Sequence, residues 1–247
     1  MNSAPLVEIF SSVQGEGPYV GYRQAFIRFH GCNLECAYCD TVQPTPPTHC
    51  RFESEPGSGI FCELPNPVTL AAVIEIISRW RERFPSLHHS LSLTGGEPLL
   101  HVKTLTQWLP DLRTIIPLYL ETNGTLPVSL ANVIDHLDFI SMDIKLPSVS
   151  GCLSLWDTHR EFLHIAARGE VVVKVVVGPE TTLAEIETAS LLIRGVEQSI
   201  PLILQPVTRN GRSTVPAQFL LKFQELAARI LTDVRIIPQT HVFLNLL

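Results

Sequence analysis

A near-continuous apolar run at residues 171–177, of sequence VVVKVVV, is the feature that most constrains the fold. A strand with one face in water alternates apolar and polar residues, whereas a strand of a parallel sheet is covered on both faces and is apolar almost throughout. Comparable strand-like runs alternate with helical ones along the chain. The strands are expected at residues 24–30, 90–93, 118–121, 139–145, 202–205 and 234–237, and the helices at 68–84, 102–109, 130–137, 157–167, 183–194 and 217–231. This repetition predicts an α/β fold with a parallel sheet. About six repeats are too few for a closed eight-stranded barrel, so we expect a partial, open β/α barrel.

Three cysteines follow the first of these strands with the spacing C-x3-C-x2-C: Cys32, Cys36 and Cys39. A cluster of four irons and four sulfides is normally held by four cysteines, so three leave one iron open to a ligand that is not protein. An open metal position usually indicates catalysis, as it does in zinc enzymes. The alternative is a zinc knuckle that takes its fourth ligand from His30 or His49.

The cysteine loop is one of five polar segments that follow predicted strands. In barrels of this kind, ligands and catalytic groups lie at the carboxyl ends of the strands. The other four segments are Thr94-Gly95-Gly96-Glu97, Glu121-Thr122-Asn123-Gly124, Asp143-Ile144-Lys145 and Gln205-Pro206. Each alone is equally typical of a turn or a helix cap. Their coincidence at five strand ends predicts a common pocket.

Composition limits the classes of protein to consider. The chain has 247 residues, 45% of them hydrophobic, enough for one large domain over residues 1–247. Its net charge of −6 offers no basic surface for nucleic acid. No segment reaches the roughly 18 apolar residues of a membrane span, and the N-terminus, with Pro5 and Glu8, lacks the basic start of a signal peptide. We therefore expect a cytoplasmic protein that binds neither nucleic acid nor a membrane. Because that compartment keeps thiols reduced, the other three cysteines are expected to be inert bystanders: Cys50, Cys62 and Cys152.

Residues 42–67 depart from the βα pattern. They contain six prolines and two glycines, which predicts an irregular insertion between the cysteine loop and the first helix. A loop of this length inside a compact domain is typically a lid, an interface or a mobile segment.

The motifs resemble known families. The segment GCNLECAYCDT, residues 31–41, places Tyr38 before the last cysteine, and TGGEP follows a short apolar run at residues 94–98. Together they resemble the radical S-adenosylmethionine (SAM) enzymes, in which the methionyl group of SAM chelates the open iron. The motifs VQGEG at 13–17, LQPV at 204–207, QTH at 239–241 and LN at 244–245 narrow the resemblance to the 7-carboxy-7-deazaguanine synthase family over nearly the whole chain.

The resemblance implies an activity and its cofactors. Members convert 6-carboxy-5,6,7,8-tetrahydropterin to 7-carboxy-7-deazaguanine with loss of ammonia, as lyases on the route to queuosine and other 7-deazapurines. The implied cofactors are a [4Fe-4S] cluster, SAM and Mg²⁺. A homodimer and an electron donor such as flavodoxin or ferredoxin are implied as well. The alternatives are another radical SAM enzyme, such as an activase that makes a glycyl radical on a partner protein, or a non-enzymatic zinc-binding module.

Site residues follow from the resemblance by position. Cys32, Cys36 and Cys39 would hold the cluster, and the Thr41 hydroxyl would bind Mg²⁺, a cation that prefers oxygen ligands. The residues that would surround SAM are Tyr38, Cys39, Asp40, Gly96, Glu97, Asp143, Ile144, Lys145, Leu204, Gln205, Pro206 and Val207. Those that would hold the pterin are Val13, Gln14, Gly15, Glu16, Arg28, Thr94, His241 and the C-terminal Leu247. Gln and Glu match the mixed donors and acceptors of a pterin edge, and an Arg can grip its carboxylate. At residues 143–145 the chain reads DIK, where many members carry SPK.

Overall fold

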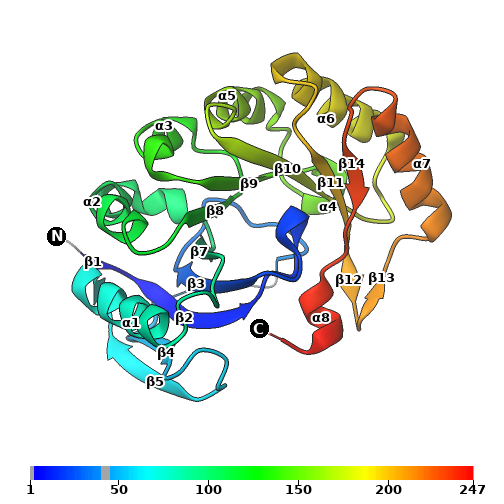
Figure 1. Ribbon diagram of the computed structural model, residues 1–247. Coiled ribbons are helices and arrows are strands. Elements are labelled where there is room, and N and C mark those ends of the chain that lie inside the picture. Colours follow the sequence, from blue (N-terminus) through cyan, green and yellow to red (C-terminus); the bar gives the residue numbers. More distant parts are fainter. Residues whose placement is uncertain (1–2, 40–44, 247) are drawn as a thin grey trace.

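The computed structural model describes residues 3–39 and 45–246. Its centre is a ten-stranded sheet with the order β14-β11-β10-β9-β8-β7-β3-β2-β4-β5. Seven neighbouring strands are mutually parallel: β3 (Arg23–Phe29), β7 (Ser90–Gly95), β8 (Leu118–Thr122), β9 (Phe139–Ile144), β10 (Glu170–Val177), β11 (Leu202–Pro206) and β14 (Val234–Ile236). Figure 1 shows these strands curving into an incomplete barrel with the longer helices outside it. The predicted partial β/α barrel is confirmed.

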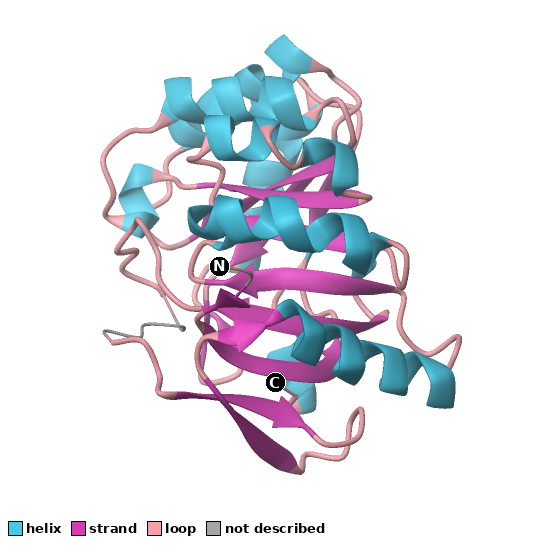
Figure 2. Cartoon of the chain, turned by 90° about the vertical axis from the view of Figure 1, so that its left-hand side faces the viewer, coloured by secondary structure: helices cyan, strands magenta, loops and turns pink. Residues whose placement is uncertain are grey.

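The long helices bury one apolar face each against the sheet. They are α1 (Leu70–Arg83), α2 (Val102–Arg113), α5 (Trp156–Ala166), α6 (Leu183–Val196) and α7 (Ala217–Ala228). The side chain of Thr69 caps α1 by accepting from the Ala72 amide. In α6, Thr182 and Glu185 form a reciprocal capping box. The strands lie one above another in Figure 2, with long helices in front of them and above them.

The helix predicted at 130–137 is broken in two. The structure has a short helix α3 (Pro127–Ala131) followed by a 3₁₀ turn η3 (Ile134–His136). Asn132 is the reason, because its side-chain amide donates to the Val128 carbonyl at 2.6 Å while its backbone amide turns to Ser129. Such local side-chain bonds compete with the regular helical ladder.

The expectation of an irregular insertion at 42–67 is wrong for its described part. Strands β4 (His49–Glu53) and β5 (Phe61–Pro65) form an antiparallel hairpin that extends the sheet beyond β2 (Leu6–Val13), a strand that the sequence analysis missed. The hairpin is fixed by the buried carboxylate of Glu53, which accepts from the amides of Ser11, Gly57 and Gly59 at 2.8–3.0 Å. Residues 42–44 lie outside the described part of the chain.

Smaller elements complete the structure. They are the strand pairs β1 (Ser3–Ala4) with β6 (Val68–Thr69) and β12 (Thr208–Arg209) with β13 (Arg212–Ser213), the helices α4 (Pro147–Ser150) and α8 (Thr240–Leu244), and the 3₁₀ turns η1 (Gly17–Tyr19) and η2 (Pro98–His101). None of the helices in the described residues is long and apolar enough to cross a membrane.

Candidate active site

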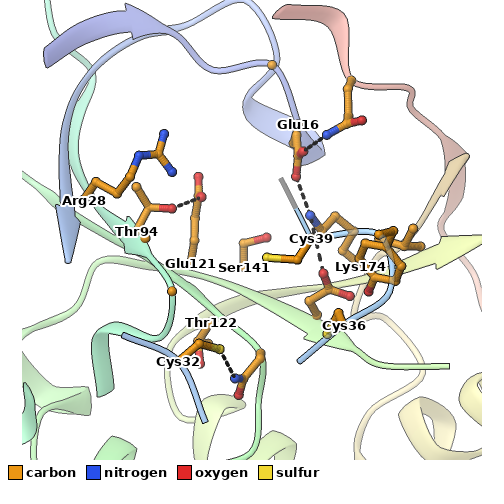
Figure 3. Close-up of a pocket in the computed structure, with 18 of the residues that line it drawn as sticks. Glu16, Arg28, Cys32, Cys36, Cys39, Thr94, Glu121, Thr122, Ser141 and Lys174 are labelled. Atoms are coloured by element: carbon orange, nitrogen blue, oxygen red, sulfur yellow. Dashed lines mark hydrogen bonds and ion pairs between the residues drawn. The ribbon is translucent and has the colours of Figure 1, made fainter. Parts of the chain in front are cut away.

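One cavity of about 880 Å³ opens at the carboxyl ends of the parallel strands. Its walls come from β2, β3 and β7 to β11, together with the cysteine loop and the segment around α8. All five polar segments predicted at strand ends contribute to this wall. Figure 3 shows side chains from these separate elements converging on the same space.

The cysteine loop forms one end of the cavity. Cys32, Cys36 and Cys39 all line it. The Cys32 thiol accepts from the side-chain amide of Asn123 at 3.8 Å, as drawn in Figure 3. The thiol of Cys152, expected to be a bystander, lies 3.9 Å from that of Cys36. Among the described residues, no three His, Cys, Asp or Glu side chains stand close enough together to chelate a single metal ion.

The paired glycines let β7 meet the cysteine loop backbone to backbone. The Gly96 amide donates to the Phe29 carbonyl at 3.2 Å, and the next amide donates to the Gly31 carbonyl at 2.8 Å. A Cβ atom on Gly96 would overlap the Gly31 oxygen and lie 2.5 Å from its carbonyl carbon. Only glycine permits this approach.

Glu97 was predicted to contact SAM, but the structure places it behind the cavity wall. It is fully buried and is not among the described lining residues. Its carboxylate accepts from the Leu99 amide at 3.0 Å, the Thr122 hydroxyl at 2.9 Å and the Asn123 amide at 2.7 Å. Burial raises the pKa of Glu97 to about 7, although these donors favour the ionised form. Two further predicted SAM contacts also lie behind the wall: Ile144 and Leu204.

The remaining predicted SAM contacts in the described chain line the cavity. Lys145 donates to Asp143 Oδ2 at 2.8 Å and to the Tyr38 hydroxyl at 3.2 Å. Asp143 Oδ1 and Gln205 Oε1 are buried, and neither has a hydrogen-bond partner among the residues that the structure describes. Buried acceptors are normally satisfied, so these two atoms indicate where a ligand with donor groups binds. The rest of this set also lines the cavity: Cys39, Gly96, Pro206 and Val207.

The opposite end of the cavity gathers the predicted pterin contacts. Gln14 donates to Glu121 Oε1 at 2.7 Å, and Thr94 donates to Glu121 Oε2 at 2.7 Å. Arg28 Nε pairs with Glu8 at 2.8 Å, and its guanidinium faces the cavity above the Phe10 ring. The other described members of the predicted set also line the cavity: Val13, Gly15, Glu16 and His241.

The C-terminal segment docks directly on Gly15. The Thr240 amide donates to the Gly15 carbonyl at 2.9 Å. A Cβ atom on Gly15 would overlap the His241 ring and lie 2.6 Å from its Cγ. Glycine at this position therefore allows His241 to reach the cavity. Three predicted site residues lie outside the described residues: Asp40, Thr41 and Leu247.

Lys174 is a site residue that the sequence analysis did not single out. It forms an ion pair with Glu16, which also accepts from Gln239 at 2.9 Å. Burial opposes ionisation of Glu16, but the charges and hydrogen bonds of Lys174, Gln239 and His241 outweigh it and lower the pKa to about 2. The signal was present in the sequence, because a single lysine inside a buried valine strand needs a partner.

An open β/α barrel with a three-cysteine loop at its mouth is the architecture of a radical SAM protein, and the family model "Radical SAM superfamily" matches residues 26–192. The structure is similar to that of QueE from Escherichia coli, with a TM-score of 0.56 and 22% identity over 97% of this chain and 95% of that one. It is also similar to Streptococcus suis SuiB bound to S-adenosylmethionine, with a TM-score of 0.54 and 13% identity over 86% of this chain and 46% of that one. At these identities the two structures show a shared fold.

Sequence comparison narrows the assignment. A curated 7-carboxy-7-deazaguanine synthase from Geobacter sulfurreducens is 54% identical over 98% of this chain and 97% of its own length. One from Methanothermobacter thermautotrophicus is 34% identical over 98% of each chain. The chain therefore belongs to the 7-carboxy-7-deazaguanine synthase family of the radical SAM superfamily. This membership removes the zinc-binding module from consideration and implies a [4Fe-4S] cluster and SAM as cofactors.

Proposed function

We propose that the chain converts 6-carboxy-5,6,7,8-tetrahydropterin to 7-carboxy-7-deazaguanine with loss of ammonia. It would act as a lyase in the synthesis of queuosine and other 7-deazapurines. One observation carries the proposal: a single cavity has three cysteines at one end and a cluster of carboxylate, amide and guanidinium groups at the other. A pterin that bears a carboxylate fits such a cluster, because it offers both ring donors and an anion.

The residues at the cysteine end fit the cluster and SAM. Cys32, Cys36 and Cys39 would supply the three thiolates that the cluster needs. The unpartnered acceptors of Asp143 and Gln205 would take hydrogen bonds from the hydroxyl and amino groups of SAM. When bound, the cluster and SAM would supply the radical chemistry that removes a hydrogen atom from C6 of the pterin. The contribution of the chain is binding, orientation and exclusion of side reactions.

The remaining predicted SAM contacts fall into two groups. Six would frame the cofactor: Tyr38, Cys39, Gly96, Lys145, Pro206 and Val207. Asp40 is proposed on position in the sequence alone, since it lies outside the described residues. Glu97, Ile144 and Leu204 complete the proposed SAM set from behind the cavity wall, where they are buried.

At the other end of the cavity, different residues would contact different parts of the pterin. The ionised Glu16 accepts hydrogen bonds and would face ring N–H groups. Arg28 uses Nε for Glu8, which leaves its terminal amino groups for the substrate carboxylate. Glu121 is held in place by Gln14 and Thr94 through one carboxylate oxygen each. The rest of the proposed pterin contacts are Val13, Gly15, His241 and Leu247.

Further parts of the proposal rest on family resemblance. Thr41 would give an oxygen to Mg²⁺ near the substrate carboxylate. The electron donor would be a flavodoxin or a ferredoxin, and the protein would work in the cytoplasm as a homodimer of single-domain chains.

Anaerobic turnover tests the proposal. The reconstituted protein is incubated with 6-carboxytetrahydropterin, SAM and dithionite, and the products are identified by mass. We expect a product lighter than the pterin by one ammonia. Cleavage of SAM with no change in the pterin would contradict the proposal and favour a different radical SAM enzyme, such as the glycyl-radical activase. The Cys36→Ala variant should form no product, whereas Cys62→Ala, which changes an exposed cysteine outside the cavity, should behave as wild type.

A further inference from the structure

Lys174 is the single charged residue in the valine run of β10. Its side chain is 13% exposed and lines the cavity, reaching toward Glu16 in Figure 3. Placing an ammonium group in an otherwise apolar strand is costly unless the group is paired. The position therefore indicates a role within the cavity rather than in the core.

Two carboxylates share the Lys174 ammonium. It pairs with Glu16 Oε2 and lies 3.6 Å from Asp143 Oδ2, the residue directly opposite on β9. Asp143 has its own closer partner, Lys145, at 2.8 Å. Among the described residues, Glu16 has no second ion-pair partner, because its other hydrogen bond comes from the neutral side-chain amide of Gln239 and the nearby His241 adds only a weaker positive charge. Without Lys174, the Asp143 carboxylate would still be paired with Lys145, whereas the Glu16 carboxylate would lose its ion-pair partner.

The protonation state of Glu16 determines which edge of a bound heterocyclic ligand it can recognise. An ionised carboxylate is an acceptor at both oxygens, with about four lone-pair positions in all. Lys174 and Gln239 occupy one position on each oxygen, so each oxygen keeps capacity for one more donor. A protonated carboxyl group, by contrast, presents one donor and one acceptor.

We propose that Lys174 is a positioning residue that determines specificity, because it keeps Glu16 an acceptor at both oxygens and so selects a ring edge with two adjacent N–H donors. The 2-amino group and N3–H of a pterin form such an edge. A lumazine, which carries a 2-oxo group in place of the 2-amino group, presents an acceptor beside the N3–H donor and is rejected. The inference rests on the proposed function of the cavity as a pterin site.

Binding of two unreactive analogues tests this role. Affinities of 6-carboxypterin and 6-carboxylumazine are measured anaerobically by calorimetry on the SAM-loaded protein. Wild type should prefer the pterin by at least about tenfold, because a site built for two donors leaves a polar group unpaired with the lumazine. Glu16→Gln should shift the preference toward the lumazine, since an amide offers one donor and one acceptor.

Lys174→Met should produce the same shift, because the unpaired Glu16 would then take up a proton. The double variant should show no further change, as expected when two residues act through one interaction. SAM affinity of Lys174→Met should stay within about threefold of wild type, since Lys145 still pairs with Asp143. Lys103→Met, an exposed lysine on α2, is the matched control and should keep the wild-type preference. If the Lys174→Met variant does not fold, Lys174→Gln is measured in its place and the same shift in preference is expected.

Several results would overturn the inference. An unchanged pterin preference in both Lys174 variants would do so while leaving the proposed function intact. If Lys174→Met loses SAM binding and keeps the preference for the pterin, Lys174 serves the cofactor and not the pterin. If the changes in ligand preference add fully in the double variant, Lys174 and Glu16 act independently and the inference is wrong. Wild-type protein that binds neither analogue would overturn the proposed function together with the inference.

Discussion

Replacing Gly96 with alanine tests whether the contact between β7 and the cysteine loop holds the loop in place. The added Cβ would overlap the Gly31 carbonyl oxygen and lie 2.5 Å from the Gly31 carbon and 3.0 Å from the Cys32 amide nitrogen. All three are backbone atoms that cannot rotate away, so the loop itself would have to move. Overpacking of this kind typically costs about 1–3 kcal/mol.

Gly195 in α6 offers the matched control. No atom lies within 4 Å of its Cβ position apart from its own helix backbone and chain neighbours, in the part of the chain that the structure describes. Alanine there should stabilise the protein by up to about 1 kcal/mol, because glycine loses more backbone entropy in a helix. For a chain of this size, each kcal/mol shifts Tm by about 2–4 °C. Gly96→Ala should therefore melt about 2–12 °C below wild type, and Gly195→Ala up to about 4 °C above it.

The assay has two parts. Thermal unfolding of the metal-free variants is followed by circular dichroism, and iron content is measured after reconstitution. We expect Gly96→Ala to bind less iron than either wild type or Gly195→Ala, because the displaced loop carries Cys32. If Gly96→Ala has the same Tm as wild type and binds the same amount of iron, the contact between Gly96 and Gly31 does not position the loop and the reasoning is refuted.

Three further predictions concern the cavity and its charges. Cys36→Ala should bind little iron while Cys62→Ala binds the wild-type amount, and about four irons retained in Cys36→Ala would contradict the assignment of the loop. Arg28→Ala should weaken 6-carboxypterin binding about 30-fold or more by calorimetry, because truncating one side of a buried charged pair costs about 2–5 kcal/mol. SAM binding should be unchanged. An equal loss of affinity for both ligands would show that Arg28 contacts SAM and not the pterin. The folded-state pKa of Glu16, about 2, lies below its ordinary value of 4.5, so the stabilisation that it contributes, up to about 3 kcal/mol, is complete above pH 4.5 and is lost as the pH falls toward 2. Urea unfolding between pH 6 and pH 3 should thus show a steeper loss of stability in wild type than in Glu16→Gln, and parallel curves would argue against this pairing.

Local patterns in the sequence were sufficient for the barrel and for the position of the cavity. The seven parallel strands were all expected, because buried parallel strands are apolar almost throughout and helices follow them at regular spacing. The three cysteines and the paired glycines were recognised as contiguous motifs. Since all parallel strands end at the same edge, their polar termini had to meet there.

Contacts between distant residues were beyond the reach of those patterns. The hairpin of β4 and β5 is held to the sheet by contacts with a distant segment, among them the hydrogen bond that Glu53 accepts from the Ser11 amide, 42 residues away. A proline-rich segment gives no local sign of such a partner, so it was expected to be irregular.

The same reason explains why the residues that line the cavity differ in part from the predicted site residues. The sequence placed Glu97 just after a strand and Lys174 inside one, but their surroundings depend on segments far away in the chain. Packing of Thr122 and Asn123 buries Glu97 behind the wall, although its motif suggested a ligand contact. Lys174 meets Glu16 across 158 residues, and only the closed arrangement of β10 against the N-terminal segment brings them together. Most of the chemistry-bearing residues could therefore be named from the sequence, whereas which of them line the cavity was decided by tertiary packing.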